Sequence, residues 1–120
     1  MLDDAYSVLA AKGMTGAASE FNAGGKWKRG TSYVVLVEFD GHMLAHSDNV
    51  KMVGKNMLGG LDANGKPFVQ ETIKNLKTTG TDSVVDFRWR NPVTNKIDNA
   101  TVNARRVPGK DAYLAVISFE

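Results

Sequence analysis

Residues 33–41 read YVVLVEFDG. Most of the first seven are β-branched or aromatic, and the run is too short for a helix, so it predicts a strand. Asp40-Gly41 follows directly and is a strong signal for a tight turn, because glycine tolerates a positive φ. We therefore expect residues 43–46 to return as a second strand, paired with the first in antiparallel fashion.

The sequence before this hairpin predicts a helix and a loop. Residues 3–21 place apolar side chains at three- and four-residue steps, which is typical of a helix. Gly13 and Gly16 weaken that helix and allow a break within it. Residues 22–30 contain three glycines and are expected to form a loop.

The sequence after the hairpin predicts a second helix and three more strands. Residues 47–65 are interrupted by glycines and read as a loop, and Pro67 suits the first position of a helix. The three strands are expected at residues 83–90, 97–107 and 112–119, with short turns between them. The order helix, two strands, helix, three strands predicts an α+β domain with one antiparallel sheet, whose helices cover one face.

The composition is that of one folded domain. The chain has 120 residues, of which 42% are hydrophobic and 23% charged, and its formal net charge is +2. Basic and acidic residues are interspersed, so we expect no nucleic-acid partner. No apolar run approaches the ~20 residues that span a bilayer, and residues 1–11 lack the features of a signal peptide. If the natural protein is exported or anchored, we expect the responsible segment to lie outside this sequence.

No motif predicts catalysis, a cofactor or a metal. Residues 60–67 match the phosphate-loop pattern G-x-x-x-x-G-K, but Pro67 stands where a Ser or Thr should hold Mg²⁺. The chain has two histidines, His42 and His46, and two imidazoles alone do not make a convincing metal site. We expect His42 to be an exposed turn residue. For His46, a pocket-lining role and a purely structural role both remain open.

Val85, Phe87 and Trp89 alternate along one expected strand and so share one face of the sheet. Such a row forms either plain core packing or the wall of a pocket, since small-molecule sites are mostly apolar and aromatic. The pattern alone supports both interpretations.

Taken in order, several short segments resemble the type 2 single Cache domain over residues 20 to 119. The matching segments are Tyr33-Val-Val-Leu-Val-Glu-Phe-Asp-Gly41, Leu44-Ala-His46, Val53-Gly-Lys-Asn56, Asp62-Ala-Asn-Gly-Lys-Pro-Phe68, Phe87-Arg-Trp89 with Asn91-Pro92, and Arg106-Val-Pro-Gly109. Each segment is weak alone, whereas the ordered set is specific.

The resemblance implies one domain over residues 1–120. A long N-terminal helix (residues 1–23) would precede a PAS-like five-stranded antiparallel sheet (residues 33–119), with one further helix over the sheet. The family implies a non-catalytic periplasmic sensor of bacterial signal transduction or chemotaxis. It also implies a membrane-anchored parent or partner signalling protein, and a homodimer contact through the N-terminal helix.

The resemblance also implies a ligand and a place for it. Similar domains bind mostly small organic acids, on the sheet face beneath the loop and helix that precede the third strand. The segment 52–61 would form the lid, and His46 and Asn103 would be polar anchors. The expected ligand-binding residues are Tyr33, His46, Phe87, Trp89 and Asn103.

The chain departs from the family pattern at the pocket. The family often has a lysine near Ala100 and a tyrosine at Asn103, and glycines in the last strand are replaced by Ala115 and Ile117. An isoleucine adds volume to a packed interior. We therefore predict a smaller or chemically different pocket, or an empty one.

Arg88, Arg90 and Arg105 could replace the missing lysine only if they point inward. Alternation from Trp89 predicts instead that Arg88 and Arg90 point outward. The replacements at Ala100 and Ile117 favour an alternative function, a PAS-like interaction or assembly protein without a small-molecule ligand.

Overall fold

The computed structural model describes residues 1–79 and 81–119. Its helical elements are α1 (Leu2–Asn22), η1 (Gly25–Trp27), η2 (Val50–Met52) and α2 (Phe68–Thr79). Its strands are β1 (Lys28–Arg29), β2 (Ser32–Glu38), β3 (Met43–His46), β4 (Asp82–Arg90), β5 (Ile97–Arg106) and β6 (Ala112–Phe119). Both expected helices and all five expected strands are present. β1 is an additional short strand in a segment for which we expected a loop.

The strands form one antiparallel sheet in the order β1-β2-β6-β5-β4, with β3 paired to β2 outside this path. Leu36 of β2 lies opposite Ala45 of β3 and also opposite Leu114 of β6. The segment YVVLVEF, residues 33–39, therefore lies in the interior of the sheet. This α+β arrangement confirms the predicted fold class, with six strands in the described part of the chain instead of five.

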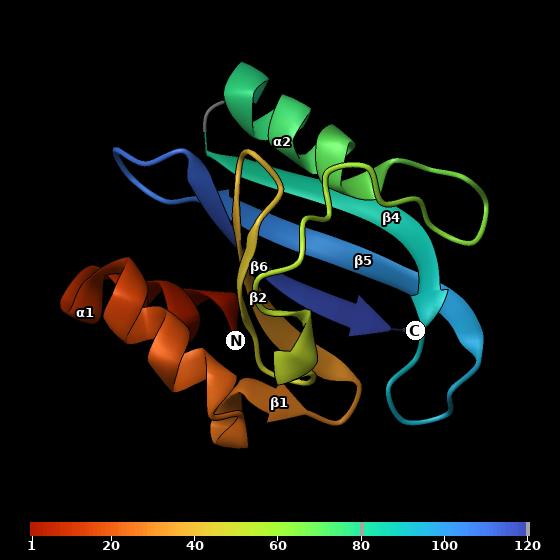
Figure 1. The fold of residues 1–120 in the computed structure, drawn as a ribbon, viewed down its shortest axis with the longest axis horizontal. Coiled ribbons are helices and arrows are strands. Elements are labelled where there is room, and N and C mark those ends of the chain that lie inside the picture. The colour runs from red at the N-terminus through yellow and green to blue at the C-terminus, as the bar shows by residue number, and fades with distance from the viewer. Residues whose placement is uncertain (80, 120) are drawn as a thin grey trace.

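The two helices lie on opposite faces of the sheet (Figure 1). α1 packs on the face that carries Val34 and Leu36, whereas α2 packs on the face that carries Val35 and Val37. The expectation that both helices cover one face is wrong. The reason lies in β2, where successive side chains are buried on both sides of the strand, so each face needs its own cover.

α1 is broken at Gly13, which has φ 73° and ψ 179°. A positive φ is accessible to glycine without steric cost, so the predicted weakness becomes a real interruption. An ion pair of 2.7 Å between Lys12 and Glu20 spans the break, and Glu20 also accepts a hydrogen bond from the Trp27 indole. No helix among the described residues is long and apolar enough to cross a membrane.

Candidate functional site

A small cavity lies between the sheet and α2. The strands of the sheet supply its floor, α2 supplies Phe68 and Val69, and the segment after β3 supplies Met52 and Met57. The volume inside it that is open to a water molecule is about 40 Å³. It is lined by Tyr33, Val35, Val37, Met43, His46, Met52, Met57, Phe68, Val69, Phe87, Trp89, Val102, Tyr113 and Ile117.

The volume limits what the cavity can hold. One water molecule needs roughly 10–15 Å³ of such space, so the cavity has room for about three waters or a molecule of similar size. Ile117 projects into it, and Ala115 is buried on the same face of the last strand. Both replacement residues therefore lie at or beside a small cavity.

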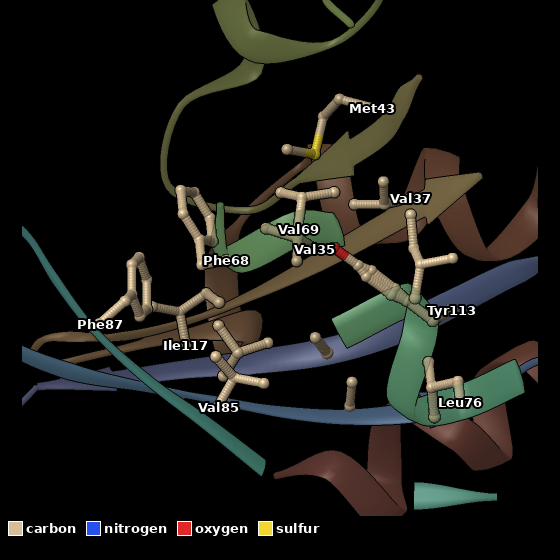
Figure 2. Packing of buried hydrophobic residues seen from close by; sticks show 14 of the residues in the cluster. Val35, Val37, Met43, Phe68, Val69, Leu76, Val85, Phe87, Tyr113 and Ile117 are labelled. Atoms are coloured by element: carbon tan, nitrogen blue, oxygen red, sulfur yellow. The ribbon is translucent and has the colours of Figure 1, made fainter. Parts of the chain in front are cut away.

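Tyr113 supplies a polar group in the middle of this apolar lining. Its side chain is buried, and its hydroxyl makes no hydrogen bond to the described part of the chain. In Figure 2 the hydroxyl oxygen points between Val35 and Val69, toward the centre of the cluster. Burial raises the pKa of the Tyr113 phenol, so the group is a neutral O–H donor. The hydroxyl borders the space of the cavity, so a molecule held there can accept a hydrogen bond from it.

His46 is the imidazole of the cavity. Its Nδ1 accepts backbone N–H bonds from Asp48 at 3.3 Å and from Asn49 at 2.8 Å. Because Nδ1 is the acceptor, the proton of the neutral ring resides on Nε2, which makes no hydrogen bond to the described residues. Burial lowers the pKa of His46, although the charge of Asp48 opposes this. His46 is therefore a neutral Nε2–H donor.

Tyr33 stacks on this imidazole, with ring centroids 4.7 Å apart and an interplanar angle of 22°. Burial first, and the charge of Asp48 second, raise the pKa of the Tyr33 phenol. Its hydroxyl is thus also neutral, and it makes no hydrogen bond to the described residues. The stacking holds both rings at the same end of the cavity.

Three aromatic rings form the other wall. Phe68 stacks on Phe87 with centroids 4.5 Å apart, and Trp89 lies 5.1 Å from Phe68. The row predicted from alternation on β4 is therefore both core packing and pocket wall, since Phe87 and Trp89 line the cavity while Val85 packs beside it.

The segment over the cavity is tied to the β2–β3 hairpin. The backbone N–H of Met43 donates to Lys55, and that of Met57 donates to Gly41. Gly41 has φ 100°, and a Cβ there would lie 2.7 Å from the backbone nitrogen of Leu58. The hairpin turn thus needs glycine for its conformation and also for the close approach of this segment.

Asp62 explains the segment that resembles a phosphate loop. Its carboxylate accepts backbone N–H bonds from Asn64, Lys66 and Arg88, at 2.8 to 2.9 Å. Partial burial acts to raise the pKa of Asp62, but these three bonds together lower it. The side chain anchors residues 62–66 to β4, so the motif is a structural turn before α2.

The structure brings together four of the five residues that we expected to bind a ligand. Tyr33, His46, Phe87 and Trp89 line the cavity. Asn103 lies on the opposite face, because β5 presents its neighbours Val102 and Ala104 to the α2 side. There it borders a surface hollow near the start of α1.

Tyr113 is the residue that the sequence analysis missed. It alternates with Ala115 and Ile117, which the family comparison had already placed beside the pocket. The three arginines considered as substitute cations, Arg88, Arg90 and Arg105, do not line the cavity. Arg88 bonds Asn99 on the other face, and the described residues that line the cavity include no lysine or arginine.

Comparison with known families gives one match that covers most of the chain. The model of the family described as single Cache domain 2 matches residues 10–120. A search of curated proteins finds no match.

Solved structures with the same fold cover nearly all of the chain at low identity. A periplasmic sensor domain of a chemotaxis protein is 17% identical with a TM-score of 0.82, over 98% of this chain and 89% of its own. A Cache chemosensory domain solved for carboxylic acid recognition is 18% identical with a TM-score of 0.76, over 98% of this chain and 82% of its own. A methyl-accepting chemotaxis protein from Vibrio parahaemolyticus is 18% identical with a TM-score of 0.74, over 98% and 78%. At these identities the likeness establishes the fold.

Proposed function

The chain belongs to the single Cache domain 2 family, and from this premise we propose that it is a non-catalytic sensor module that binds one small organic molecule in the cavity under α2. The observation that carries the proposal is the buried Tyr113 hydroxyl, which points into the cavity and has no partner among the described residues. Together with Tyr33 and His46 it offers donors in an otherwise apolar enclosure. A molecule with an acceptor atom would satisfy them.

A short organic acid or a close analogue fits this enclosure. Space for about three waters corresponds to roughly three or four non-hydrogen atoms, which is the size of a one- or two-carbon acid. The solved Cache domain with carboxylic acid recognition supports the same ligand class. Phe68, Phe87 and Trp89 would contact the carbon chain.

The module would act outside the cytoplasmic membrane, as part of a chemoreceptor or histidine kinase. The structural relatives described as periplasmic or chemotaxis domains support this location. The N-terminal helix would carry the signal, because the end of α1 is bonded to the strand that holds His46. A shift in α1, or in its packing against a second copy, would be the output.

A thermal-shift and calorimetric screen tests the proposal. The panel would hold two- to four-carbon acids, the matching amides, amino acids and purines, at pH 5 and pH 7. We expect the smallest acids or amides to raise the melting temperature, because a ligand at 100 times its Kd adds about 2.7 kcal/mol to the stability of the folded state. Asn103→Ala should bind as the parent does, because Asn103 lies on the other face.

The small cavity also favours a second candidate, an assembly module that uses the sheet without a ligand. The same screen separates the two functions. If no compound of any class stabilises the protein and the cavity remains closed in crystals grown with the panel, the assembly function replaces the sensor function.

A further inference from the structure

The described residues that line the cavity supply no permanent positive charge. Among the described residues that line it, the side chains with an N–H or O–H group are those of Tyr33, Tyr113, His46 and Trp89. A carboxylate that leaves water normally needs a cation or several strong donors to offset the loss of hydration. The charge state of the ligand therefore depends on whether His46 can become a cation.

The hydrogen bonds of His46 oppose its protonation. Nδ1 already accepts from two backbone N–H groups, those of Asp48 and Asn49. A proton on Nδ1 would face these two donors, and both hydrogen bonds, which are partly buried, would be lost. The ring is thus held as the neutral Nε2–H tautomer by the backbone around it.

The charges nearest to this end of the cavity do not favour an anion either. Asp48 acts on Tyr33 and disfavours its ionised form, and the same field opposes a carboxylate beside that ring. The Lys28 ammonium forms an ion pair of 2.6 Å with Asp48, so Asp48 already balances its positive charge. The groups that face His46 are therefore Asp48 with its partner Lys28 and the neutral phenol of Tyr33.

Resting on the function proposed above, we propose that the cavity takes its ligand in uncharged form. The ligand is either a neutral molecule of about three or four non-hydrogen atoms with one acceptor oxygen, or a short carboxylic acid that binds protonated. Two of the phenol and imidazole donors would bond the neutral oxygen, which has two lone pairs, and the aromatic wall would contact the carbon chain. The cavity then selects against carboxylate anions of the same shape.

A pair of isosteric ligands tests this selection. Acetamide and acetate have the same number of non-hydrogen atoms and differ in charge. In calorimetric titrations of the full chain at pH 7, we expect acetamide to bind at least ~10-fold more tightly than acetate, because only the anion loses the hydration of a full charge. Tyr113→Phe should weaken acetamide binding, which would place the molecule in this cavity.

The pH dependence separates a protonated ligand from a protonated histidine. Above the pKa of acetic acid, we expect its apparent affinity to fall about tenfold per pH unit, since the neutral fraction falls by that factor. In His46→Asn the amide Oδ1 can still accept the backbone N–H bonds, but the side chain cannot titrate. The same slope in this variant supports the proposal, and a flat profile would show that His46 itself supplies the charge.

The results separate a failure of the uncharged-ligand proposal from a failure of the sensor function. If acetate binds at pH 7 as tightly as acetamide, the uncharged-ligand inference is wrong while the sensor function stands. If neither molecule nor any longer homologue binds at either pH, the sensor function itself is wrong.

Discussion

The side chain of Asn22, the last residue of α1, is bonded to the backbone of the strand that carries His46. Its Oδ1 accepts the His46 backbone N–H at 2.9 Å, and its Nδ2 donates to the Leu44 carbonyl at 3.3 Å. β3 pairs on its other side with β2. One amide thus bonds two groups on the outer edge of β3 and joins the N-terminal helix to the strand that carries the imidazole of the cavity.

Asn22→Ala should loosen this connection. The change leaves the His46 N–H and the Leu44 carbonyl without their partner, so we expect the free energy of unfolding to fall by about 1–3 kcal/mol. If α1 carries the signal, ligand-induced protection of its amides from hydrogen exchange should also be lost. Urea denaturation and exchange mass spectrometry measure these effects. Ser19→Ala, exposed on the same helix, is the control and should change neither.

Ile117→Ala should enlarge the cavity. Removing these buried groups costs about 2–5 kcal/mol, which urea denaturation would measure. We expect the variant to bind four-carbon amides that the parent rejects, and this binding should restore part of the lost stability. Ile97→Ala makes the same substitution at an exposed position and is the control. An unchanged ligand size range in Ile117→Ala would show that this side chain does not set the limit.

Most of the strand pattern could be predicted because the chain alternates cleanly and marks its turns. The bounds of β3 and β6 match the predicted residues 43–46 and 112–119. The placement of the helices could not be predicted in the same way. The run 33–37 is apolar on both faces, and alternation does not tell which helix covers which side.

The candidate site was predicted where strand phase could be counted from an aromatic residue. Phe87 and Trp89 fix which residues of β4 face the cavity. The same alternation predicts that Arg88 points away from it, and the bond of Arg88 to Asn99 agrees with this. β5 offers no such marker, because Ala100, Val102 and Ala104 are small and polar residues alternate with them. Asn103 was therefore assigned from the family pattern, and the structure places it on the other face.

Asp62→Ala should release the turn before α2 and change the acid stability of the protein. Three backbone N–H groups lose their acceptor, so we expect the free energy of unfolding at pH 7 to fall by about 2 kcal/mol or more. The folded-state pKa of Asp62 is lowered, so its contribution is complete above the unfolded pKa, near 4, and is lost as the pH falls through the folded value.

Urea denaturation between pH 2 and pH 7 measures both effects of Asp62. The parent and Asp62→Ala should differ most at neutral pH and converge in acid. Asp86→Ala is the matched control, since Asp86 is exposed on the neighbouring strand. A difference between parent and Asp62→Ala that is independent of pH would mean that the lost bonds do not require the charged carboxylate.

Tyr113→Phe separates a binding role for this hydroxyl from a structural one. The change removes one oxygen that has no protein partner among the described residues and keeps the ring that packs in the core. The hydroxyl borders the cavity and makes no hydrogen bond to the described residues, so the ligand-free variant should be about as stable as the parent. Its ligand-induced rise in melting temperature should be smaller, because the bound molecule loses a donor. Melting curves with and without ligand measure both quantities. A hydroxyl that served the fold would give the reverse, a less stable protein whose response to ligand is unchanged.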